Sequence, residues 1–156
     1  MKVQTTRFGV LELENSNILT FTEGLLGFPD YTKYVLLDHD KSGIFQWLQS
    51  VENEDLAFVL IEPLRIVPDY RVEVHEKDVE DIKLQSPDTA VMACIVNIGK
   101  DCSSVTVNLL GPIVINPREM LAKQIVLVSS QYSIRHDIMA EALLQPSAAA
   151  RKTAQR

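Results

Sequence analysis

Short runs of strand-forming residues, each bounded by turn signals, recur along this 156-residue chain and restrict its fold more than any other feature. The first runs lie at 3–6, 10–13 and 18–21, with Gly9 and the sequence ENSN between them. The others are expected at 34–37, 45–48, 57–61, 91–98, 105–109, 113–115 and 124–129. About ten short strands at such spacing are typical of a sandwich or a small barrel. The sequence therefore predicts a mainly β protein: a small antiparallel β-barrel-like single domain.

Two kinds of strand can be distinguished by their patterns. The runs AFVLI (57–61) and VMACIVNI (91–98) do not alternate, which indicates strands covered on both faces. The run SVTVNLL alternates, so Val105, Val107 and Leu109 are predicted to share one face. The alternating run should therefore have one face toward the core and the other toward solvent.

Two or three short helices are expected besides the strands. One is predicted at 76–84, where Val79 and Ile82 lie three residues apart among acids. A second is expected from Pro117, a favoured first helical residue, and a third at 137–144. After it the sequence is small, polar and basic, and such composition offers little apolar surface for folding. We expect one domain at 1–145 and a mobile basic tail at 146–156.

Hydrophobic residues make up 46% of the chain and charged residues 23%, as in soluble globular proteins. No apolar run reaches the ~20 residues that cross a bilayer. The start, MKVQTTRFGV, lacks the apolar core of a secretory signal. We therefore expect a cytoplasmic protein that does not enter the membrane.

The charge of the chain is uneven. Its net charge is −6, which becomes −9 once the three basic residues of the last ten are set aside. Such a body repels phosphate backbones, so direct nucleic-acid binding is not expected. The acid either attracts a basic protein partner or only keeps the protein soluble, and composition does not decide between the two.

Motifs for catalysis or metal binding are not found. The sequence holds no P-loop, no G-x-S-x-G, no G-x-G-x-x-G and no H-E-x-x-H. In Asp38-His39-Asp40, a strand would point the acids away from the histidine. Cys94 and Cys102 fit neither a redox pair nor a zinc site and are expected to be free thiols, although facing strands would also allow a disulfide. We predict no enzyme, no metal and no cofactor.

Six motifs in order resemble the flagellar assembly factor family FliW. They are RFG at 7–9, GLLGFPDY from Gly24, FQWLQS from Phe45 with AFVLIEP shortly after, PDY at 68–70, VNLLGPIVIN from Val107 and QIVLVSSQYSIRH from Gln124. The resemblance covers about residues 1–138. Two departures are Leu26, where the family more often has proline, and Gly111, where it more often has alanine.

The resemblance implies a compact β-barrel-like protein without catalytic activity in the bacterial cytoplasm. Similar proteins hold newly made flagellin before export, and they bind the small basic repressor CsrA when flagellin has left. Binding to CsrA lifts the repression of flagellin translation. We expect this protein to have the same two partners and to be a monomer when it is free.

Two candidate surfaces follow from this resemblance. A negative face for CsrA would use the exposed acids of the 51–56 connector and of the segment 73–81, namely Glu52, Glu54, Asp55, Glu73, Glu76, Asp78, Glu80 and Asp81. Beside the connector, we expect the large apolar side chains to fill the core: Phe45, Trp47, Phe58 and Leu60.

An apolar surface for flagellin would use the loop GLLGFPDY, with Leu25, Leu26, Phe28 and Tyr31. Alternatively, Leu25 and Phe28 plug one end of the barrel. A competing class of function is a scaffold or a barrel that holds a small molecule in its lumen. The continuous apolar strands favour a filled lumen over a cavity.

Overall fold

The computed structural model describes residues 1–39, 41–86, 89–100, 104–128 and 131–138. The expected basic tail and all but the first two residues of the expected helix at 137–144 lie outside the described residues. No helix among the described residues is long and apolar enough to cross a membrane.

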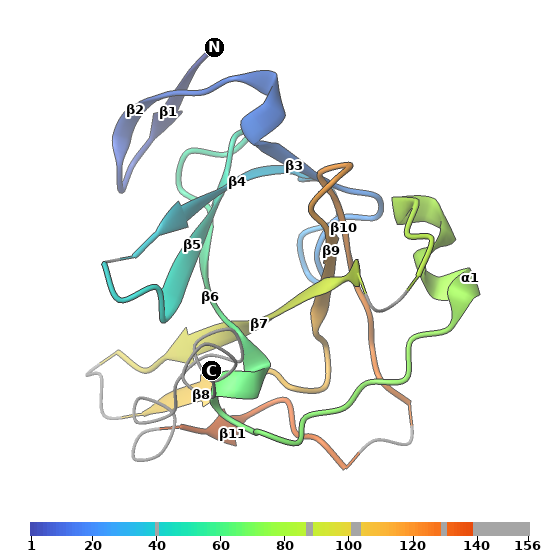
Figure 1. The fold of residues 1–156 in the computed structure, drawn as a ribbon. Helices are drawn as coiled ribbons and strands as arrows, with labels where there is room; N and C mark the ends of the chain where they lie inside the picture. Colours follow the sequence, from blue (N-terminus) through green and yellow to red (C-terminus); the bar gives the residue numbers. More distant parts are fainter. Residues whose placement is uncertain (40, 87–88, 101–103, 129–130, 139–156) are drawn as a thin grey trace, which may run out of the picture.

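Seven strands close into a barrel (Figure 1). They are β3 (Ile18–Phe21), β4 (Lys33–Asp38), β5 (Phe45–Ser50), β6 (Ala57–Ile61), β7 (Val91–Ile98), β9 (Ile113–Asn116) and β10 (Leu121–Gln124). Their order is β7-β6-β5-β4-β3-β10-β9, and the pairing of β7 with β9 completes the ring. The predicted mainly β, barrel-like fold is confirmed. One pair, β3 with β10, is parallel, and the other pairs are antiparallel.

The strand β7 is long enough to serve two partners along one edge. Its first residues, Val91–Ala93, pair with β9, whereas Val96–Ile98 pair with β8 (Val105–Val107). β8 pairs in turn with β11 (His136–Asp137). The sequence did not predict β11, because two residues are too few to show a pattern.

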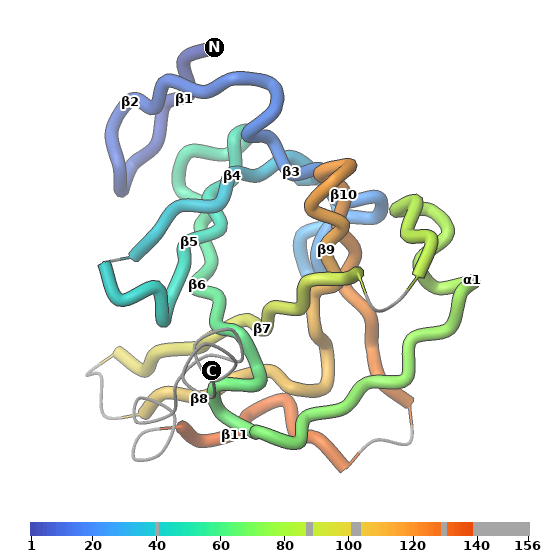
Figure 2. Tube along the Cα trace, in the orientation of Figure 1, coloured from blue at the N-terminus to red at the C-terminus, as the bar shows by residue number. Residues whose placement is uncertain are grey.

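The N-terminal hairpin lies outside the barrel, in the upper left of Figure 2. It consists of β1 (Lys2–Thr5) and β2 (Gly9–Glu12). Val3 and Leu13 are buried against Val35 on the outer face of β4. The hairpin therefore covers the part of β4 that would otherwise expose apolar side chains to water.

The lumen is lined by the largest group of buried side chains. These are Leu19, Phe21, Leu25, Tyr34, Leu48, Leu60, Ala93, Ile113, Ile115 and Ala122. Tyr34 meets the ring of Phe21 edge to face, with 5.2 Å between centroids. Aromatic pairs prefer this geometry, and it fixes how the side chains interdigitate. The barrel thus encloses a packed core.

Two further buried groups lie outside the ring. One packs Cys94, Val107 and Leu109 under Tyr70, which follows the 3-10 turn Pro63–Arg65. The other packs Val79 and Ile82, from the helix α1 (Glu76–Val79) and the 3-10 turn Glu80–Ile82, against β9. The predicted helix at 76–84 is thus present in shorter form, and a further 3-10 turn spans Asn15–Asn17.

The expected helix from Pro117 is wrong. Asn116 uses its side-chain oxygen to accept from the amides of Arg118 (3.1 Å) and Glu119 (3.4 Å), which makes a turn. Met120 then adopts a left-handed φ of 54°, and β10 begins at Leu121. The strand expected at 124–129 therefore lies earlier than predicted. An asparagine that bonds its own following backbone competed successfully with the proline signal.

The expected core residues of β5 and β6 were partly wrong. Leu60 is buried, whereas Phe45 and Phe58 are half-buried against the core groups. Trp47 is half-buried on the outer side, where the Arg7 guanidinium lies 4.4 Å from the centroid of its ring. His39 stacks on the same ring at 5.8 Å. Of the two strands predicted to be covered on both faces, β6 has three half-buried residues and β7 is exposed at its ends.

The prediction for the alternating run is confirmed on its apolar side. Val107 and Leu109 are fully buried and Val105 is half-buried against the same group. Ser104 is exposed.

Candidate partner-binding surfaces

The acidic connector 51–56, between β5 and β6, is held to its neighbours by its own carboxylates. The Glu52 carboxylate accepts from the amides of Thr32 (2.7 Å) and Lys33 (2.9 Å), at the start of β4. The Asp55 carboxylate accepts from the Thr6 hydroxyl, and the Thr6 amide donates to the Glu54 carbonyl at 3.0 Å. Two of its three predicted acids therefore fasten the connector to the barrel and to the hairpin.

A buried amide side chain supports this connector from below. Gln49 is fully buried, and its Nε2 donates to the carbonyls of Ser50 (2.9 Å), Leu56 (3.2 Å) and Glu54 (3.3 Å). Ser50 Oγ accepts from the amides of Glu52 and Asn53. Sequence reasoning missed this role, although a glutamine beside the apolar residues of a strand that ends in a turn is a signal that its amide pairs with backbone.

The second acidic segment, the predicted 73–81 widened to 69–81 to include Asp69, is attached differently. Its only acid with a hydrogen bond or ion pair among the described residues is Asp81, which accepts from the Thr22 hydroxyl (2.9 Å) and pairs with Lys123 (3.3 Å). The carboxylates of Asp69, Glu73, Glu76, Asp78 and Glu80 have no such partner in the described part of the chain. Most of this segment's negative charge therefore faces solvent.

The two acidic segments do not form one face. The connector adjoins the hairpin, whereas α1 lies on the right side of the barrel in Figure 1. The structure thus separates Glu52, Glu54 and Asp55 from the segment 73–81.

The loop GLLGFPDY has one buried and several exposed apolar residues. Leu25 is buried in the lumen group, whereas Leu26 is 63% and Phe28 38% exposed. Phe28 meets Phe58 edge to face at 5.3 Å, and Tyr31 is half-buried against the same group. Leu25 therefore plugs the barrel, while Leu26 and part of Phe28 remain accessible.

The conformation of this loop depends on its first glycine and on β10. Gly24 has φ of +73°, and a Cβ there would lie 2.8 Å from the Pro29 carbonyl oxygen, so a larger residue does not fit. The Leu26 amide donates to Gln124 Oε1 at 2.9 Å. A proline at 26 would lack the amide hydrogen for this bond.

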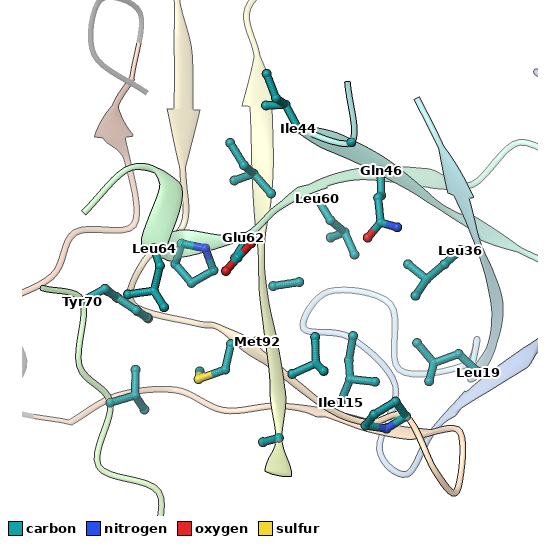
Figure 3. Close-up of a pocket in the computed structure, with 18 of the residues that line it drawn as sticks. Leu19, Leu36, Ile44, Gln46, Leu60, Glu62, Leu64, Tyr70, Met92 and Ile115 are labelled. Carbon is teal, nitrogen blue, oxygen red and sulfur yellow. The ribbon is translucent and has the colours of Figure 1, made fainter. Parts of the chain in front are cut away.

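An apolar pocket of about 600 Å³ extends from the lumen, and Figure 3 shows side chains that line it. Leu19, Leu60 and Ile115 belong to the lumen group, and Gln46 and Glu62 supply polar atoms. Sequence reasoning favoured a filled lumen and did not predict this pocket. It arises where strands and loops that are distant in sequence meet.

The described cysteine, histidine and acidic residues do not come together in a catalytic or metal-binding site. Cys94 is a buried free thiol, and its burial raises its pKa to about 12, despite an opposing hydrogen bond with Tyr70. Such a thiol is not a nucleophile at neutral pH. No group of three or more His, Cys, Asp or Glu in the described ranges could hold a metal. Cys102 and Asp40 lie outside the described residues.

The fold and these surfaces define a class of protein: a small closed β-barrel with exposed carboxylates on one side and an apolar loop at one end. The family model described as "FliW protein" matches residues 2–138, and the chain belongs to this family. Its relatives are flagellar assembly factors.

The comparisons with individual proteins agree. The chain is 42% identical over 139 residues to the flagellar assembly factor FliW of Natranaerobius thermophilus, with 88% of this chain and 92% of the relative covered. It is 41% identical to that of Geobacter sulfurreducens, with 91% and 89% covered. A crystal structure of the flagellar assembly factor FliW matches with a TM-score of 0.81 at 29% identity, over 95% of this chain and 99% of that one.

Proposed function

We propose that this flagellar assembly factor binds flagellin in the bacterial cytoplasm and, when it is not so occupied, binds CsrA and antagonises its repression of translation. The protein acts by binding alone, without catalysis, metal or cofactor, and is a monomer when free. Membership of the FliW family is the observation that carries this proposal.

The segment 69–81 supports the CsrA half of the proposal. Its acids are exposed apart from half-buried Asp78, and only Asp81 has a hydrogen bond or ion pair among the described residues, so most of their charge is available to a basic partner. Acidic and basic faces that match steer association and raise its rate. The same charge would repel the phosphates of RNA bound to CsrA.

The loop with Leu26 and Phe28 supports the flagellin half. Leu26 and Phe28 are exposed, and Gln124 and Gly24 fix the backbone that presents them. The terminal helices of unassembled flagellin carry apolar stripes, which pack against an apolar surface with a polar rim. Leu25 is no longer a candidate contact, because it is buried.

A pull-down with purified flagellin and purified CsrA tests the proposal. The protein should retain each partner alone, and flagellin added in excess should release CsrA. Retention of neither partner would refute the proposal.

A second candidate, a small-molecule-binding barrel, is favoured by the pocket in Figure 3. Ligand pockets are concave and mostly apolar with few polar groups, and this one has Gln46 and Glu62. Thermal shift against a metabolite panel separates the candidates. Stabilisation by a metabolite, with no binding of either protein, would support the second.

A further inference from the structure

Residues 125–127, which follow β10, belong to no assigned strand but pair with the neighbouring loop 110–112 in a strand-like way. The amides of Ile125 and Leu127 donate to the carbonyls of Pro112 and Leu110, both at 2.9 Å. Successive amides of an extended chain point to opposite edges, so the amide of Val126 points away from 110–112, and the amide of Val128 follows at the bend that ends this stretch. Among the described residues nothing accepts from them. Val126 and Val128 are 51% and 87% exposed, which leaves an accessible, unpaired edge.

A second extended segment borders the same space. Residues 71–75, between the 3-10 turn Pro63–Arg65 and α1, line a groove of about 820 Å³ together with 125–128. Figure 1 shows these stretches, in green and orange, at the lower right. The Arg71 amide donates to the Tyr132 hydroxyl at 2.9 Å. The amides of the next three residues have no acceptor in the described part of the chain.

The charge of this groove indicates its occupant. Asp69, Glu73 and Asp78 line it, and none has a hydrogen bond or ion pair among the described residues. Among the described residues that line it, Arg71 is the only Lys or Arg. Apolar contact comes from valines on both sides. The groove is thus suited to an extended chain that alternates apolar and basic side chains.

We propose that this groove binds an extended basic segment of a partner protein, which adds as a strand to the edge at Val126 and Val128. The lysines or arginines of that segment lie beside Asp69, Glu73 and Asp78. Main-chain hydrogen bonds supply affinity in this mode, and side-chain contacts supply specificity. This groove would hold the basic partner of the proposed function, and only the identity of that partner as CsrA rests on the proposed function.

Fluorescence anisotropy with a labelled octapeptide of alternating valine and lysine tests the groove directly. The peptide should bind, and its counterpart with glutamate in place of lysine should not. Two further peptides carry N-methyl groups on either the valine or the lysine amides. One methylation pattern should abolish binding and the other should preserve it, because only every second amide faces the protein edge.

Protein variants locate the binding. The double variant Glu73→Lys/Asp78→Lys should bind the valine–lysine peptide at least tenfold more weakly. Its matched control, Glu12→Lys/Glu54→Lys, changes the net charge equally near the hairpin and should bind as the parent does. Circular dichroism and thermal melts check that both variants are folded.

The outcomes separate this proposal from the proposed function. Equal binding of the two methylated peptides, or equal weakening by both double variants, would refute strand addition in the groove. If CsrA binds but is insensitive to Glu73→Lys/Asp78→Lys, the groove proposal alone fails. If the peptide behaves as expected and CsrA does not bind, the groove stands and the CsrA assignment fails.

Discussion

The connector 51–56 and the segment 69–81 are both rich in acidic residues, but the carboxylates of the two segments have different contacts. In the connector, Glu52 and Asp55 accept hydrogen bonds from barrel and hairpin groups. In the segment, Asp81 alone of the acids is engaged among the described residues. One cluster stabilises the fold, and the other remains available for a partner.

Acidic composition alone therefore does not predict which carboxylates are available to bind a partner. A carboxylate next to unpaired amides at a strand start satisfies those amides, as Glu52 does for Thr32 and Lys33. The Glu76 carboxylate, in the first turn of the short helix α1, makes no hydrogen bond or ion pair among the described residues. Local backbone geometry therefore decides which acids are structural.

The largest expected effect comes from Glu52→Lys. It removes two charge-assisted hydrogen bonds to backbone amides and should lower the free energy of unfolding by about 1–2 kcal/mol. This loss is smaller than two buried hydrogen bonds to a charged group would give, because the site is exposed. Urea unfolding measures it. The matched variant Glu54→Lys, whose side chain makes no bond among the described residues, should unfold like the parent. If both variants are equally stable, the Glu52 carboxylate does not stabilise the fold as its contacts indicate.

The next effect is on binding. Glu73→Lys/Asp78→Lys should weaken CsrA binding about tenfold, or about 1.4 kcal/mol, while stability changes by less than about 0.5 kcal/mol. Calorimetry at two salt concentrations measures the affinity, which should fall as salt rises. Flagellin binding should survive. If Glu54→Lys weakens CsrA binding more, the connector is the CsrA face after all.

A smaller effect is expected from Asp81→Asn. It removes the ion pair with Lys123, in which the two side chains are 38% and 18% exposed, and weakens the bond from Thr22. Pairs this close to solvent contribute about 0.2–1 kcal/mol. The melting temperature should fall by about one or two degrees, as expected for a loss of stability of that size. Glu80→Gln on the same turn should show none, and a decrease there would mean that the segment is more engaged than its contacts indicate.

The smallest effect is expected from truncation after Gln145, which removes the three basic residues of the last ten. The melting temperature should stay nearly constant, since the family match ends at residue 138. CsrA binding should be retained. A drop of many degrees would show that the tail contributes to the stability of the barrel.

The fold class, most strand positions and the family could be predicted from the amino-acid sequence. Turn residues at short intervals and runs such as AFVLI are local signals, and six motifs in order identify FliW without any contact information. The burial of Val107 and Leu109 also followed, because alternation along one strand needs no knowledge of its neighbours.

Features that depend on residues distant in sequence could be seen only in the folded protein. The turn at Asn116 replaced a predicted helix, and Trp47 proved to be half-buried on the outer side, where the hairpin brings Arg7 to its ring. Glu52 became structural because β4 begins beside it. The unpaired edge at Val126 exists because Leu110 and Pro112 occupy the other edge. Such roles are set by which backbone groups meet in space, and a linear pattern does not contain that pairing.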